Sequence, residues 1–221
     1  MRKQVWIERL GMLCLFLFLI SLAITVTINF RWLYHFDIQQ LNILDYTDIS
    51  KEELIKNYGL LLDFLNNPLN TTLALPDFPM SAAGAGHFYD VKKLFLLNYG
   101  VLLVTLIPSF MLLRSFWKND QRWRLLRPLQ WGMLLPIFFG FLMAIGFDRF
   151  FVTFHEIFFN NDDWLFDPVT DPIINVLPET FFMHCFILFF VLIELFFFVI
   201  YWWAKQSQKK DYFISEKRPR G

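Results

Sequence analysis

The chain has 221 residues, of which 56% are hydrophobic and 20% aromatic, and its 20 Lys and Arg balance 20 Asp and Glu. Its 29 phenylalanines are far more than a soluble globular domain of this length carries. Two cysteines exclude a disulfide framework, and neither CxxC nor HExxH spacing occurs. The zero net charge leaves no overall basic excess for nucleic acid. The composition therefore indicates an integral membrane protein.

Four stretches are long and apolar enough to cross a bilayer, whose hydrocarbon core requires about 20 residues of helix. The first follows a basic leader but stays apolar for longer than a cleaved signal peptide does, so we interpret it as an anchor. We therefore expect an all-α polytopic membrane protein. The predicted spans are Leu10–Phe30, Leu94–Leu113, Trp131–Phe147 and Thr180–Ala204.

Lys and Arg are distributed unevenly among the segments that flank the spans. Residues 1–9, 114–127 and 205–221 hold three, five and six of them, whereas residues 31–93 and 148–179 hold five and one. Because basic residues accumulate on the cytoplasmic side, both termini are predicted to be cytoplasmic and the tail solvated and partly disordered. The predicted organisation is 1–30 with the first span, 31–93 as an extracellular cap, 94–147 with the second and third spans, 148–179 as an extracellular catalytic loop or helix, and 180–221 with the fourth span and cytoplasmic tail.

The cap is predicted to contain a helix of its own. Ser50 and Glu53 have the S-x-x-E spacing of a capping box. Apolar residues follow at helical spacing, and the Asn66-Asn67-Pro68 sequence ends the pattern. This helix would cover the outer ends of the spans.

His155 is the strongest candidate for a catalytic residue. It follows the third span among phenylalanines, and Asp148 lies seven residues earlier, on the same face if the helix continues. A histidine in an apolar pocket near a carboxylate can be neutral near pH 7 and oriented as a base. The alternative is an interfacial histidine in an aromatic belt.

His87 and Asp90 stand one helical turn apart just before the second span. His87 is predicted to face one pocket with His155, or else to be only a polar cap. Lys92, Arg149 and Asp90 are candidates for binding substrate, and Lys92 and Arg149 also for stabilising negative charge. Lys92 could instead extend to lipid headgroups, and Arg149 could pair with an outer carboxylate. Two histidines and a carboxylate can hold a metal, but this spacing is unspecific, and we predict no metal site.

Other ionisable residues lie in or near the spans. Glu194 lies within the fourth span, where an ionisable residue is a functional candidate by default. It falls on the predicted inner half, far from His155, so protonation or a contact with another helix is its expected role. His35 and His184 lie near the outer ends of the first and fourth spans, where a structural role suffices.

Three motifs flank the spans in a distinctive order. They are HFYDVKKLF before the second span, FHEIFF after the third and DPVTDPIINVLPETFF leading into the fourth. With the four spans, they resemble the lipoprotein intramolecular transacylases, the Lit family of low-GC Gram-positive bacteria. The resemblance covers nearly the whole chain.

The resemblance implies acyl transfer within one substrate molecule. The substrate is a lipoprotein whose N-terminal cysteine carries a thioether-linked diacylglyceryl group. Its sn-2 acyl chain moves to the cysteine α-amino group and leaves a lyso-form lipoprotein. The implied general base is the histidine of the FHEIFF motif, His155. We add the hypotheses that His87 binds the oxyanion or the glyceryl group and that Asp148 or Asp90 orients an imidazole.

Diacylglyceryl lipoproteins and membrane lipid are the expected partners, with no nucleic acid. No cofactor, metal or ATP is expected, because ester-to-amide transfer is downhill. The active site is expected at the extracellular leaflet of the plasma membrane. The sequence does not determine the oligomeric state, and a monomer is compatible with it. One alternative is a non-enzymatic transport or assembly factor, which predicts a polar path through the spans. Another, a metal-dependent intramembrane protease, requires a ligand spacing that the sequence lacks.

Overall fold

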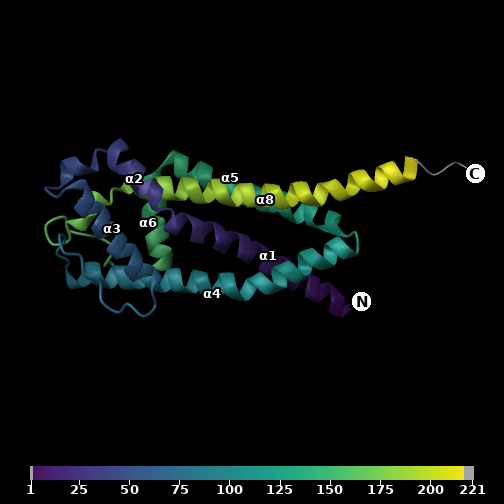
Figure 1. The fold of residues 1–221 in the computed structure, drawn as a ribbon, viewed down its shortest axis with the longest axis horizontal. Helices are drawn as coiled ribbons and strands as arrows, with labels where there is room; N and C mark the ends of the chain where they lie inside the picture. Colours follow the sequence, from purple (N-terminus) through teal and green to yellow (C-terminus); the bar gives the residue numbers. More distant parts are fainter. Residues whose placement is uncertain (1, 217–221) are drawn as a thin grey trace, which may run out of the picture. The chain divides into compact units, whose positions relative to one another are not determined.

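The computed structural model describes the backbone of residues 2–216 and the side chains of residues 4–206. The described residues form helices and connecting turns, with no strand among them (Figure 1). The predicted all-α fold is thus confirmed. The elements are α1 (Arg2–Asn29), α2 (Arg31–Gln40), η1 (Ile43–Tyr46), α3 (Lys51–Asn66), α4 (Ala82–Lys118), η2 (Arg122–Leu125), α5 (Leu126–Ile145), α6 (Phe147–Phe158), α7 (Ile173–Val176) and α8 (Glu179–Glu216).

Four helical segments in the described part of the chain are long and apolar enough to cross a membrane, which confirms the four predicted spans. Each is longer than predicted, because the helices continue beyond their apolar residues. In particular, α8 runs to Glu216, so the expectation of a partly disordered tail is wrong up to that residue; its remainder lies outside the described residues. The segments are Gln4–Asn29, Ala82–Lys118, Arg122–Ile145 and Glu179–Gln206.

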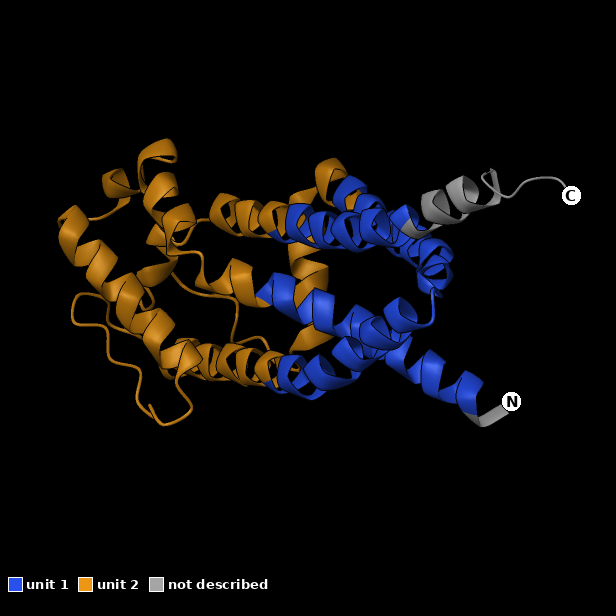
Figure 2. Cartoon of the chain, turned by 45° about the vertical axis from the view of Figure 1, so that its right-hand side comes forward, with its two compact units in different colours: residues 1–24, 100–141, 189–221 blue, residues 25–99, 142–188 orange. Residues whose placement is uncertain are grey.

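The chain divides into two compact units, which Figure 2 colours separately. Unit 1 consists of Met1–Ile24, Gly100–Phe141 and Phe189–Gly221. Unit 2 consists of Thr25–Tyr99 and Leu142–Leu188. Both predicted outer segments therefore belong to unit 2, together with the adjoining ends of the long helices.

Unit 1 has an apolar core made of long helices. An ion pair joins Arg124 to Glu8 at 2.6 Å between Nη2 and Oε2. Aliphatic and aromatic side chains bury the contact faces, as close packing of helices requires. The buried core residues are Leu15, Leu19, Ala23, Leu112, Phe116, Leu125, Leu129, Ile193, Phe197 and Ala204.

In unit 2, the cap helix α3 forms as the sequence predicts. The Ser50 side chain accepts from the Glu53 backbone N–H, and the Glu53 carboxylate accepts from the Ser50 backbone N–H, which completes the capping box. The helix ends at Asn66, as predicted. Its apolar face packs in a core that also contains residues of α2, η1, α4, α7 and α8. The buried residues of this core include Tyr34, Ile38, Ile43, Leu54, Leu61, Leu62, Phe64, Leu65, Phe88, Ile173, Val176 and Phe181.

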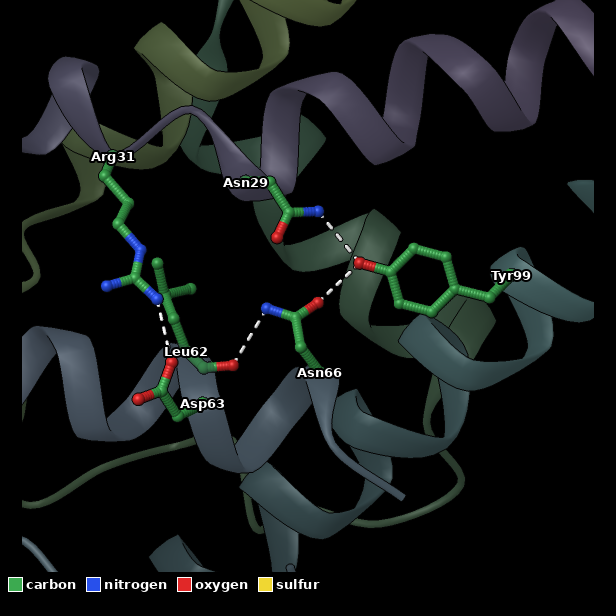
Figure 3. Close-up of polar contacts among 6 residues, drawn as sticks. All are labelled: Asn29, Arg31, Leu62, Asp63, Asn66 and Tyr99. Atoms are coloured by element: carbon green, nitrogen blue, oxygen red, sulfur yellow. Dashed lines mark hydrogen bonds and ion pairs between the residues drawn. The ribbon is translucent and has the colours of Figure 1, made fainter. Parts of the chain in front are cut away.

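A polar junction in unit 2 connects the end of α1, the end of α3 and the middle of α4 (Figure 3). The Tyr99 hydroxyl accepts from Asn29 Nδ2 at 2.8 Å and donates to Asn66 Oδ1 at 2.5 Å. One α3 turn away, Arg31 pairs with Asp63 at 2.8 Å. These contacts fix the end of the cap helix to the end of α1, the start of α2 and the middle of α4.

The third span does not continue into the helix that carries His155. Helix α5 ends at Ile145, Gly146 is extended, and α6 begins at Phe147. Asp148 and His155 thus share one helix, α6, but this helix is separate from the third span. Because α6 is a separate short helix, its direction is set by the aromatic packing of one of its faces. Phe147, Phe150 and Phe154 each contact the Phe186 ring of α8 at 5.0–6.1 Å between centroids.

Candidate active site

The two histidines singled out in the sequence meet inside unit 2. His87 lies on α4 and His155 on α6, and their ring centroids are 5.6 Å apart. Each side chain is only 7% exposed. The predicted shared location of the two imidazoles is therefore what the structure shows.

Aromatic rings surround the histidine pair. Four of them come from α6 and from the segment that follows it, and their contacts leave little room for bulk water. Measured between centroids, the rings are Phe151 at 4.3 Å and Trp164 at 4.7 Å from His155, and Phe159 at 4.8 Å and Phe166 at 5.5 Å from His87. An imidazole in such surroundings is more stable neutral than charged.

A backbone carbonyl, rather than the predicted Asp148, orients His155. Its Nδ1 lies 2.8 Å from the carbonyl oxygen of Phe151, one helical turn earlier. A carbonyl oxygen can only accept, so Nδ1 carries the hydrogen and Nε2 keeps its lone pair. Burial lowers the pKa of His155, and the bond to Phe151 opposes this shift in part. His155 is thus a neutral imidazole with Nε2 available as a proton acceptor.

His87 differs from His155 in its hydrogen bonding. Its Nδ1 is buried and has no hydrogen-bond partner among the described residues. A buried polar atom left unpaired costs about 1–3 kcal/mol, so a polar group entering beside the ring would gain from bonding to it. One turn along α4, Asp90 accepts from Lys93 Nζ at 2.8 Å and from Asn161 Nδ2 at 2.9 Å.

Three of the predicted site residues lie away from the pair. Asp148 is exposed and lies beside the Glu179 carboxyl group, and it makes no hydrogen bond to His155 among the described residues. Arg149 is exposed on α6. Lys92 is buried, but its Nζ donates to the Asn70 carbonyl and lies 4.3 Å from the centre of the Phe64 ring, so it fastens the cap loop to α4.

Two groups of polar residues were not predicted from the sequence. The Asp37 carboxylate is completely buried and accepts from His184 Nδ1 at 2.8 Å, which gives His184 the structural role expected for it. Burial raises the pKa of Asp37, and the bond to His184 opposes this shift. Asp171, 3% exposed, accepts from the Ser81 backbone N–H at 2.7 Å. In the sequence, the only sign of either group is an Asp close to apolar residues, and this does not reveal that the Asp is buried.

No group of three His, Cys, Asp or Glu side chains within the described residues is arranged to hold a metal ion. Glu194 lies within α8, and its Oε1 is buried without a hydrogen-bond partner in the part of the chain that the structure describes. It belongs to unit 1, whereas both imidazoles belong to unit 2.

A family model described as lipoprotein intramolecular transacylase Lit matches residues 9–182. The chain belongs to the Lit family. The structure of the membrane-integral lipoprotein intramolecular transacylase Lit from Bacillus cereus, solved in meso, is 31% identical in sequence. It superimposes with a TM-score of 0.91 over 96% of this chain and 99% of that chain.

Two further solved structures are variants of the B. cereus Lit in which one histidine is replaced, by arginine or by alanine. They superimpose with TM-scores of 0.81 and 0.83, at 31% identity and over 96% of both chains. No curated protein matches the chain. The resemblance that the motifs carry is confirmed, and the chain is a multi-pass membrane protein of the Lit family.

Proposed function

We propose that this Lit-family protein transfers the sn-2 acyl chain of an S-diacylglyceryl lipoprotein to the α-amino group of its N-terminal cysteine, with His155 as general base. One observation carries the proposal: the bond from His155 Nδ1 to the Phe151 carbonyl leaves Nε2 free in an aromatic site beside a second histidine. This arrangement supplies a proton acceptor at a protected position.

The substrate amine requires such an acceptor. A free α-amino group has a pKa of about 7.7–8.0, so it is mostly protonated at neutral pH and must lose a proton to become a nucleophile. Its nitrogen then attacks the ester carbonyl carbon, a C–N bond forms, and the C–O bond to the glyceryl oxygen breaks. The proton that the ammonium loses on becoming an amine goes to solvent. His155 Nε2 takes a second proton from the nitrogen as the C–N bond forms and returns it to the departing glyceryl oxygen, so the enzyme ends unchanged.

His87 and Asp90 take the remaining polar roles. The unpaired Nδ1 of His87 bonds the ester oxygen as negative charge develops on it, which requires the tautomer with hydrogen on Nδ1. The Asp90 carboxylate, which is one helical turn from His87, attracts the α-ammonium group before it is deprotonated. Lys92 and Arg149 are outside this proposal, because neither side chain contacts the histidine pair.

The aromatic walls position the substrate. Donor ester and acceptor amine belong to the same molecule, so the site must bend the lipid head until the two groups meet. Pre-orientation of this kind lowers the barrier by about 7–11 kcal/mol when the geometry is right. Apolar ring faces bind acyl chains without fixing them by hydrogen bonds, so the head can rearrange between the two histidines.

The distribution of Lys and Arg supports an outward-facing site. Unit 2 holds both acidic outer segments, 31–93 and 148–179, whereas the basic segments belong to unit 1. By the positive-inside rule, the basic segments are cytoplasmic and the histidine pair lies at the extracellular leaflet. Lipoproteins with a processed N-terminus are exposed on that side.

The test uses purified protein in detergent and a synthetic S-diacylglyceryl lipopeptide, without metal or nucleotide. Because product and substrate have the same mass, tandem mass spectrometry must locate each acyl chain, and an amine-reactive label must count free N-termini. We expect one chain to move to nitrogen as the free amine disappears. His155→Asn should lower the rate by roughly 10²- to 10⁴-fold, the usual contribution of a general base.

The matched control is His35→Asn, because His35 packs on Trp32 of α2 and contacts neither histidine of the pair. It should retain wild-type activity. Full activity in His155→Asn would remove the assigned base. An intact substrate with well-folded wild-type protein would instead refute the transacylase itself and favour a transport or assembly role.

A further inference from the structure

The segment between α6 and α7 is fastened to α4 at both of its ends. We call residues 160–171 the strap. Near its start, Asn161 Nδ2 donates to Asp90 Oδ2 at 2.9 Å. At its end, Asp171 Oδ1 accepts from the Ser81 backbone N–H at 2.7 Å. Two hydrogen bonds about ten residues apart therefore hold the strap against the helix that carries His87.

Two glycines of α4 permit this close docking. A Cβ atom on Gly84 would overlap the Asp171 carboxylate, and one on Gly86 would lie 2.9 Å from Asp163 Oδ2. Real Cβ atoms essentially never approach other atoms so closely. The strap thus packs directly on the backbone of α4, at a distance that is possible because Gly84 and Gly86 have no side chains.

Between the tethers, the strap places Trp164 on His155. The indole and imidazole rings are stacked, with centroids 4.7 Å apart and planes inclined by 25°. Leu165, the next residue, is 62% exposed and points away. The Phe166 ring then contacts His87 at 5.5 Å, edge to face. The strap therefore covers both imidazoles but stacks only on the proposed base.

We propose that Trp164 is a positioning residue for this reaction: it holds the His155 imidazole in place and stabilises the imidazolium that forms when Nε2 takes the substrate proton. The inference rests on the proposed function. A cation over the face of an indole is attracted by the ring quadrupole, and the attraction is stronger where water is excluded. The near-parallel stack is the geometry in which a planar cation meets that face.

Within residues 4–206, whose side chains the structure describes, no carboxylate is bonded to the His155 ring. The titratable ring in contact with it is His87, which is from α4 and would repel an imidazolium if charged. Asp90 is bonded to Lys93 and Asn161. Asp163 lies against Gly86. From α8, phenylalanines pack on α6, and Glu179 lies beside Asp148 at the start of α6, two turns from His155. Burial lowers the pKa of His155, so the charge that forms there needs a compensating partner.

The experiment compares Trp164→Leu, which keeps an apolar cover without a π face, with Trp164→Phe, which keeps a π face. Rates are measured against pH with the lipopeptide used above. We expect a roughly fivefold to thirtyfold loss in Trp164→Leu, with the acidic limb of the profile moved to lower pH, and a smaller loss in Trp164→Phe. Leu165→Ala, in the exposed neighbour, is the control and should behave as wild type.

A second readout does not depend on activity. The protein has four histidines, so ring NMR of labelled histidine in micelles can follow each titration, with His155→Asn identifying the His155 signal. Trp164→Leu should lower the pKa of His155, and Trp164→Phe should lower it less.

Equal rates and an unmoved pH profile in both variants would overturn the inference while leaving the proposed function intact. A shift of the acidic limb, or of the NMR titration, to higher pH would also overturn it, because the ring would then act only by excluding water. If wild type converts no substrate but the NMR titration shifts as expected, the proposed function fails and the stabilisation by Trp164 stands.

Discussion

Replacing Gly84 with alanine tests whether the strap docks as closely as the structure shows. The new methyl group would overlap the carboxylate of Asp171, which is 3% exposed and accepts from the Ser81 backbone N–H. Losing a hydrogen bond to a charged group costs about 1.5–3 kcal/mol. The alanine recovers at most about 1 kcal/mol of helix propensity. We therefore expect a net loss of about 0.5–3 kcal/mol of unfolding free energy.

The same helix supplies the control. Gly100 has no atom within 4 Å of the position its Cβ would take, so Gly100→Ala should leave stability unchanged or raise it by up to about 1 kcal/mol. Unfolding free energies can be compared by titrating the protein in mixed micelles with SDS and following tryptophan fluorescence. Both variants replace one glycine of α4 with alanine, so the contact with Asp171 is the difference between them that the comparison tests.

A double variant completes the test. Asp171→Ser shortens the overlapping side chain, so Gly84→Ala should cost less in that background than in wild type. The transacylation rate should fall in Gly84→Ala, because a displaced strap moves the indole off His155. Wild-type stability and rate in Gly84→Ala would refute the close docking and, with it, the positioning of the strap by α4.

Three further results are expected from SDS titration or its pH dependence. His184→Ala should destabilise the protein by roughly 3–5 kcal/mol, because it leaves the Asp37 carboxylate buried without its partner. Arg31→Ala breaks an exposed pair and should cost no more than about 1 kcal/mol. Equal losses in the two variants would contradict the difference in burial. Tyr99→Phe removes two hydrogen bonds from the junction in Figure 3 and should cost about 1–3 kcal/mol, a loss that unchanged stability would disprove. Since burial lowers the pKa of His155, protonation favours the unfolded chain, and stability should fall as pH drops below about 6.5. The stability of His155→Asn should fall less steeply over the same pH range. Parallel curves for the two proteins would mean that His155 is not buried as a neutral ring.

Features that depend on neighbouring residues were accessible from the sequence. The four spans follow from unbroken apolar runs, and the Ser50–Glu53 capping box follows from a spacing of three residues. The bond from His155 to the Phe151 carbonyl is also local, since both belong to one helical turn. It was missed because a carboxylate, Asp148, offered a more familiar partner.

The sequence suggests that His87 and His155 face one pocket because both segments emerge on the same side of the membrane. The short distance between the two rings, however, depends on Gly146. The extended backbone there ends α5 and turns α6 as a separate helix, and the phenylalanines of α6 then pack on α8. No periodicity in the sequence determines that direction, because the apolar residues of α6 suit lipid as well as protein.

The sequence by itself determined a four-span membrane protein and its capped outer helix, and it singled out His155 of the FHEIFF motif, because hydropathy and helical spacing act over a few residues. Only the tertiary structure decided that Trp164 stacks on that histidine and that His184 pairs with Asp37, 147 residues away. Such contacts depend on how close two backbones can approach, as at Gly84, and on which polar groups burial forces to pair. Both are properties of packing, which the order of residues along the chain does not reveal.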